Sequence, residues 1–206
     1  MPAIGCGIGV AFGLQVPRSG PAGFDPAQLF ENGEPGAWYD PSDLSTLFQD
    51  AAGTVPVTAS GQPVRLMRDK SGHGNDLTLT NAALNDAGGL RSIVFNGFSA
   101  SGVSGSIDFT GTNQVTVWAG LRKISDGSAG TVVELSPGPA NSGIFTLSGP
   151  GTANVANYAF RSQGTTPRFA TTAANFPAVT RNVVTGIGDI AGNSVAIRVS
   201  PLKACD

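Results

Sequence analysis

Residues that interrupt regular structure recur throughout the chain, which contains 29 glycines and 14 prolines among its 206 residues. Glycine weakens the interior of a helix and proline breaks it, whereas both residues suit turns. The intervals between them are mostly too short for long helices but long enough for strands. The sequence therefore predicts a mostly β protein made of short strands and many turns.

The clearest strand signal is Val115–Arg122, in which apolar residues occupy the odd positions. This period of two indicates one buried face and one partly exposed face. Weaker strand candidates are Arg91–Phe95, Thr131–Leu135, Gly143–Ser148, Val155–Arg161, Asn182–Ile187 and Ser194–Ser200. Since no helical segments separate them, we expect an antiparallel sandwich or barrel.

Helix signals are confined to a lead-in at residues 25–60. Asp25-Pro26 and Asp40-Pro41 each place an N-capping residue before a proline that suits the first helical position. After the second pair, Leu44, Leu47 and Phe48 would form one apolar helix face, because they are three and four residues apart. Two short helices are predicted.

Residues 1–24 form a Gly-rich apolar segment before this lead-in. Its larger side chains alternate with glycine, which is typical of an extended arm; they are Ile4, Ile8, Val10, Phe12 and Leu14. The arm would pair with another subunit or form the first strand of its own sheet, and a membrane-active peptide is a third reading. The predicted organisation is an arm at 1–24 and a β-sandwich domain at 25–206.

Charge and cysteine usage exclude several classes of protein. The net charge is −2, and twelve scattered Lys and Arg residues do not make a nucleic-acid surface. The uncharged stretch before Arg18 is too short to span a bilayer and has no basic region before it, so neither a membrane span nor a signal peptide is predicted. Cys6 and Cys205 are expected to be free thiols, with a bridge between termini or subunits left open.

The titratable residues do not form a pattern typical of catalysis. Glu134 lacks a second carboxylate two residues away on its strand face, as paired glycosidase carboxylates would require. Asp69, Ser71 and His73 lie too close together for a catalytic triad and predict a tight turn instead. A calcium site formed by Asp69, Asn75 and Asp76 is a weaker alternative. We expect no enzyme activity, no catalytic residues, no metal and no cofactor.

Three aromatic residues are candidates for a ligand-facing surface. Trp38, Tyr39 and Trp118 could stack against a sugar ring, although aromatic side chains in a small sandwich more often belong to the core. The sequence is compatible with both a ligand-facing surface and a place in the core.

One block of sequence resembles a known family. It runs through Gly36–Asp50, continues in Pro56–Thr58 and Gly61–Val64, and ends in Asp69–Asn75. It resembles the segment that leads into concanavalin A-like, or laminin G-like, domains of phage and prophage virion proteins. These proteins are often described as tail or tail-fibre proteins. Later segments that fit less specifically are Ile107–Thr112, Val115–Arg122, Val132–Ser136 and Val184–Ile190.

The resemblance implies an antiparallel jelly-roll sandwich. Domains of this kind usually continue through further strands after one such as Ser194–Ser200, whereas this sequence turns at Pro201 and stops at Asp206. The sandwich is therefore expected to be truncated at its C-terminus and to have an open edge. We expect a neighbouring subunit, or the N-terminal arm of this or another copy, to cover that edge.

The resemblance also implies a role in a virus particle. The leading hypothesis is a non-enzymatic structural or adaptor protein of a tailed phage, in the tail fibre, the baseplate or the head surface. It would be assembled in the host bacterial cytoplasm, and its partners would be other virion proteins and copies of itself. Alternatives are a receptor-recognition module that binds a host-surface glycan at the tail tip, and a capsid decoration protein.

Overall fold

A computed structural model describes residues 25–127, 130–135, 144–149, 157–163 and 168–201. This part of the chain is mostly β, with antiparallel pairing wherever a register is defined. The predicted mostly β class is therefore confirmed. The described residues divide into two compact units, and each is treated by itself below. One unit holds residues 25–94 and Ser99–Phe109, and the other holds Phe95–Phe98 and the described residues from Thr110 onward.

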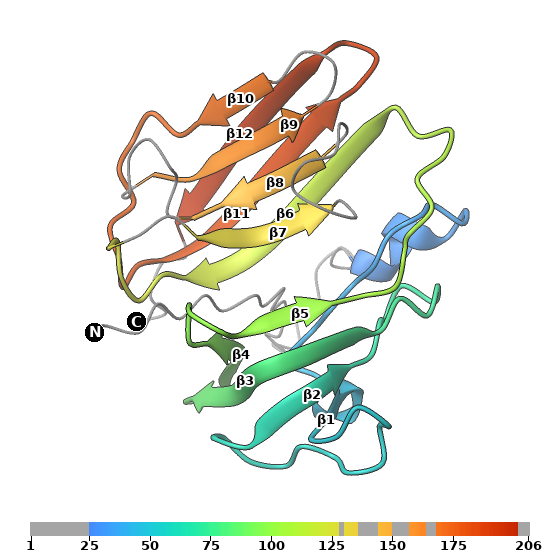
Figure 1. The fold of residues 1–206 in the computed structure, drawn as a ribbon, viewed down its shortest axis with the longest axis vertical. Helices are drawn as coiled ribbons and strands as arrows, with labels where there is room; N and C mark the ends of the chain where they lie inside the picture. Colours follow the sequence, from blue (N-terminus) through green and yellow to red (C-terminus); the bar gives the residue numbers. More distant parts are fainter. Residues whose placement is uncertain (1–24, 128–129, 136–143, 150–156, 164–167, 202–206) are drawn as a thin grey trace, which may run out of the picture. The chain divides into compact units, whose positions relative to one another are not determined.

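The first unit is built on one five-stranded sheet, of which only the last residue of one strand, Phe95, is assigned to the other unit (Figure 1). Its strands are β1 (Leu47–Phe48), β2 (Pro63–Met67), β3 (Leu77–Ala87), β4 (Leu90–Phe95) and β5 (Ser101–Val103). The strand order is β1-β2-β3-β4, and β5 pairs with β3. The long strand β3 holds the sheet together, because β2, β4 and β5 all lie beside it.

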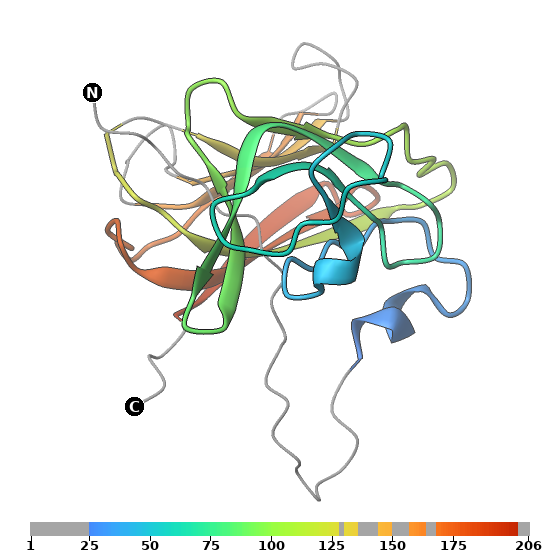
Figure 2. The same ribbon diagram turned by 90° about the horizontal axis from the view of Figure 1, so that it is seen from below.

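The two predicted helices are 3-10 helices, each drawn as a short coil in Figure 2. Helix η1 (Pro26–Phe30) is capped by Asp25, whose side chain accepts from the Ala27 N–H at 3.0 Å, as predicted. Helix η2 (Leu44–Thr46) begins later than predicted, because Asp43 rather than Asp40 caps it. The apolar helix face that was to include Leu47 and Phe48 is wrong, because both residues belong to β1.

Strand β3 contains an irregularity that conceals it in the sequence. Asn81 has a φ of 52°, in the left-handed region, where its amide donates to the Ser99 carbonyl oxygen. The buried residues Leu79, Ala82 and Leu84 are consequently three and then two positions apart instead of two throughout. The register against β2 shifts at the same place. A search for strict alternation misses this strand because the bulge breaks the period.

The second unit contains two antiparallel sheets. One has the order β10-β9-β8-β7 and the other the order β12-β11-β6. In Figure 1 strands β7 to β10 are drawn in front of β6, β11 and β12. The seven strands are β6 (Gln114–Arg122), β7 (Thr131–Leu135), β8 (Ile144–Ser148), β9 (Ala159–Gln163), β10 (Arg168–Thr171), β11 (Arg181–Asp189) and β12 (Ser194–Pro201).

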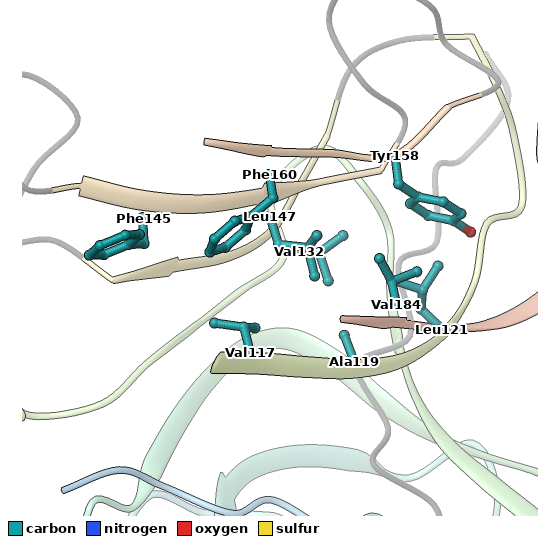
Figure 3. Packing of buried hydrophobic residues seen from close by; sticks show 9 residues of the cluster. All are labelled: Val117, Ala119, Leu121, Val132, Phe145, Leu147, Tyr158, Phe160 and Val184. Carbon is teal, nitrogen blue, oxygen red and sulfur yellow. The ribbon is translucent and has the colours of Figure 1, made fainter. Parts of the chain in front are cut away.

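Inward-facing side chains of both sheets form one apolar core (Figure 3). It comprises Val117, Ala119 and Leu121 of β6, Val132 of β7, Phe145 and Leu147 of β8, Tyr158 and Phe160 at β9, and Val184 of β11. Phe145 and Phe160 stack with their ring centroids 6.0 Å apart. Two glycines on the inner face of β11 make room for these rings. A Cβ built on Gly186 would lie 2.3 Å from Phe160 Cδ2, and one built on Gly188 would lie 2.4 Å from Phe145 Cε1.

Most of the predicted strands of this unit are present. The inner positions Val117, Ala119 and Leu121 are buried, as the alternation predicted. The β9 prediction began too early, since the strand runs over Ala159–Gln163, and the short strand β10 was not predicted.

Several predictions concern residues outside the described part of the chain. The arm residues Ile4, Ile8, Val10, Phe12 and Leu14 are among them, as are Cys6 and Cys205, so the division at residue 24 stays a prediction. No helix in the described ranges is long and apolar enough to cross a membrane.

Candidate functional site

The end of the block that carries the resemblance folds as a turn around one carboxylate, which we call the Asp69 turn (Asp69–Asp76). Asp69 Oδ1 accepts from the N–H groups of Trp38 and Ser71, both at 2.8 Å. Its Oδ2 accepts from the Ser71 hydroxyl at 2.6 Å and from the Asn75 N–H at 3.0 Å. Gly72 and Gly74 supply left-handed φ angles of 89° and 73°. The predicted tight turn is confirmed.

Further bonds attach the turn to the lead-in segment more than thirty residues earlier. The Lys70 N–H donates to the Trp38 carbonyl oxygen at 2.8 Å, and Asn75 Nδ2 donates to the Gly36 carbonyl oxygen at 2.7 Å. The Tyr39 hydroxyl donates to the Asn75 carbonyl oxygen. These bonds place residues 36–39 against the turn and use up backbone groups that would otherwise need water.

Lys70 is the central cation of this region. Its Nζ lies 3.0 Å from Asp40 Oδ2 and 3.0 Å from Asp43 Oδ2. It also lies 4.5 Å from the centroid of the Trp38 ring, which is a cation–π distance. One side chain therefore joins the Asp69 turn to the cap of η2 and to Trp38.

Hydrogen bonds and charges shift the pKa values of these groups. For Asp69, partial burial pushes the pKa up, but hydrogen bonds from Ser71, Trp38 and Asn75 outweigh it and hold the pKa below its usual value. For Lys70, burial lowers the pKa, but Asp43 and Asp40 outweigh it and raise the pKa. Burial raises the pKa of the Tyr39 hydroxyl to about 12.

The hydrogen-bond donors around Asp69 distinguish a structural turn from a calcium site and from a catalytic triad. Its oxygens receive four N–H and O–H donors, an environment that holds a carboxylate within a turn rather than leaving its lone pairs for a cation. The His73 ring lies elsewhere, with Nε2 at 2.8 Å from the Glu34 carbonyl oxygen. Neither the calcium arrangement nor the triad arrangement is formed.

The three aromatic candidates have different environments. Trp38 and Tyr39 are half-buried in the first unit and contribute to the bonds around the Asp69 turn. Trp38 Nε1 is buried and has no hydrogen-bond partner among the described residues. Trp118, in the second unit, is 46% exposed.

Trp118 lies on the outer face of the β12-β11-β6 sheet. Its neighbours on β6, Val117 and Ala119, point into the core, so Trp118 points away from it. Thr185 of β11 is opposite Trp118, and Arg198 of β12 is opposite Thr185. These three residues form a row across the sheet that combines an aromatic ring, a hydroxyl and a guanidinium group.

Glu134 is an exposed residue of β7 and lies opposite Thr146 of β8. On the paired strand β8, the residue that faces Glu134 therefore carries a hydroxyl group rather than a second carboxylate. Within the described residues, no group of three or more His, Cys, Asp or Glu side chains is placed to hold a metal ion.

The sequence interpretation missed the polar residues of the second unit's core. Lys123 is 1% exposed and Asn182 is fully buried. A signal for Lys123 is present in the sequence, because it is two residues beyond Leu121 and so continues the inner face of β6.

Comparisons with protein-family models, with curated proteins and with solved structures found no match.

Proposed function

We propose that the chain is a non-enzymatic structural or adaptor protein of a tailed-phage particle. The resemblance of residues 36–76 motivates this proposal. The observation that supports it is the state of the polar groups in that block. Asp69 accepts from the N–H groups of Trp38 and Ser71, Lys70 pairs with Asp40 and Asp43, and these bonds connect segments of the same chain. This block stabilises the fold and offers no reactive group of its own.

We further propose a jelly-roll sandwich that binds a partner at a sheet edge. The two facing sheets of the second unit support a sandwich. Among the described strands, β12 and β6 each pair with β11 alone and so form the edges of their sheet. Such edges present unpaired backbone groups to a neighbour. The apolar arm at residues 1–24, or another virion protein, would bind there.

Location in the particle tests this proposal. An epitope-tagged chain is expressed during phage assembly, and purified particles are labelled with immunogold. Labelling at the tail fibre, baseplate or head surface supports the proposal, and uniform labelling of the head identifies a capsid decoration protein. A chain that never co-purifies with particles contradicts it. A matched variant with aspartate at Ile4, Ile8 and Val10 is expected to lose incorporation at least tenfold while the fold is retained.

A second candidate function is glycan binding at the host surface. The row Trp118–Thr185–Arg198 favours it, because exposed aromatic rings stack on sugar faces while hydroxyl and guanidinium groups bind sugar hydroxyls. A glycan array tests this candidate. Binding that disappears in Trp118→Ala and persists in Phe169→Ala, an exposed aromatic on β10, supports it. The absence of binding to any glycan rejects it.

A further inference from the structure

A group of polar side chains adjoins the apolar core of the second unit at Tyr158. We call them the Lys123 cluster: Lys123, Asp126, Tyr158 and Asn182. Lys123 follows β6 directly and Asn182 is the second residue of β11. Both are buried, as is Tyr158. Burying an ammonium group and a carboxamide carries a cost in free energy, so their presence together requires an explanation.

Strand register brings Lys123 and Asn182 together. Asn182 is opposite Leu121, and Lys123 is two residues beyond Leu121 on the same inner face. Such diagonal neighbours have backbone positions about 7–8 Å apart, which the flexible four-carbon stem of lysine can bridge. Both side chains also contact the same phenol. Lys123 Nζ lies 5.0 Å from the Tyr158 ring centroid, and Asn182 Nδ2 donates to Tyr158 Oη at 3.0 Å.

The amine has a proton acceptor beside it. Asp126 Oδ1 lies 2.7 Å from Lys123 Nζ, and Asp126 Oδ2 accepts from the Ala178 N–H at 2.6 Å. The second contact anchors the carboxylate to the segment that leads into β11. Asp126 is therefore placed to take a proton from the ammonium group and convert it to a nucleophilic amine.

The carboxamide of Asn182 is held by one end only. Its Nδ2 also donates to Thr180 Oγ1 at 3.1 Å. Its Oδ1 is buried and has no hydrogen-bond partner among the described residues. A buried carbonyl oxygen without a donor is costly, so the native fold retains a poorly satisfied amide group, which shares the neighbour Tyr158 with the Lys123 amine.

We propose that Lys123 and Asn182 react after folding to form an intramolecular amide cross-link. Asp126 removes one proton from the Lys123 ammonium, and Nζ attacks Cγ of Asn182. As the Cγ–Nδ2 bond then breaks, a second proton passes from Nζ to Nδ2, so that this nitrogen leaves as ammonia. The ammonia takes the first proton back from Asp126 and departs as ammonium. One C–N bond forms and one breaks, so the step needs no oxidant or cofactor. The product joins β6 to β11 covalently and removes the buried charge.

The mass of the intact chain tests this proposal directly. The purified full chain is expected to be lighter than its sequence mass by one ammonia, and proteolysis should yield a branched peptide joining Lys123 to Asn182. The Lys123→Met and Asn182→Ala variants are each expected to have the full mass of their own sequence, without the loss of ammonia. Asn157→Ala, which alters another buried amide, should retain the loss. Asp126→Asn should slow the reaction about a hundredfold, as removal of a general base does.

Three results would overturn the proposal. They are a folded wild-type chain that keeps its full sequence mass after prolonged incubation, a loss of water that links Lys123 to Asp126, and a branched peptide that contains Asn157 in place of Asn182. Should the Lys123 variant fail to fold, the wild-type mass and its branched peptide still decide the question.

Discussion

At the scale of single residues, Asp69 illustrates how one carboxylate organises a turn. Replacement by asparagine turns one acceptor oxygen into an NH2 group that faces the donors of Ser71 or Trp38. We expect Asp69→Asn to lower the free energy of unfolding by about 2 kcal/mol, since partly buried donors lose their acceptor. Chemical denaturation measures this change. Glu134→Gln, which alters an exposed carboxylate, is the control and should change stability by less than about 0.5 kcal/mol.

Val179 is a residue at which the native side chain is unfavourable. Its φ of 69° lies in the left-handed region, which β-branched residues rarely adopt, although its N–H donates to the Lys123 carbonyl oxygen at 2.8 Å. We expect Val179→Asn to raise the free energy of unfolding by about 1 kcal/mol, because asparagine tolerates this conformation. The same change at Val55, an exposed valine outside that region, should give no gain. An equal gain at both positions would show that the loss of an exposed apolar side chain, and not the backbone conformation, causes it.

At the scale of elements, strands with strict alternation could be predicted from the sequence and irregular ones could not. The sequence predicts strand β6 because its inner residues are two positions apart. The sequence does not predict strand β3, because Asn81 interrupts that period. It predicts a start for η2 that is too early, because Asp40 and Asp43 are both good caps. The links between Lys70 and the Asp40–Asp43 pair join segments about thirty residues apart. Nothing in one sequence shows that such segments approach each other.

The packing of β11 against β9 depends on a residue without a side chain. We expect Gly186→Ala to destabilise the chain by about 1–3 kcal/mol, because its Cβ would overlap the Phe160 ring. Thermal and chemical denaturation measure the loss. Adding Phe160→Leu to Gly186→Ala should recover part of it, since a smaller side chain leaves space for the methyl group. Gly105→Ala, where a Cβ meets nothing within 4 Å, is the control. Failure of Phe160→Leu to compensate would mean that the ring is not the obstacle.

At the scale of the whole molecule, the chain has few charges, and several of them are held by hydrogen bonds in the fold. Folding lowers the pKa of Glu34 and of five aspartates, which are Asp43, Asp50, Asp69, Asp86 and Asp126. Each has a lower pKa folded than unfolded, so the unfolded chain binds more protons as the pH falls. Their stabilisation is present above the ordinary aspartate value of 3.8 and is lost as the pH falls through it and through the folded pKa values.

Lys70 and Tyr39 have the opposite sign. Both pKa values are raised by folding, so their stabilisation is complete below the unfolded value and is lost as the pH rises through the folded value. For Tyr39 this window runs from 10.0 to about 12. Folding stability should therefore be roughly constant near neutral pH and decline at both extremes.

Urea denaturation across a range of about pH 3 to 11 tests this profile. Tyr39→Phe cannot ionise at residue 39, so it should flatten the alkaline decline while leaving the acid decline unchanged. Asp69→Asn should flatten the acid decline and leave the alkaline decline unchanged, because it removes one carboxyl group whose proton affinity differs between the folded and unfolded states. The two variants act on opposite limbs of the profile although they lie in one bonded cluster. A Tyr39→Phe variant with the full alkaline decline would assign that limb to Lys70, whose partners Asp40 and Asp43 it leaves intact.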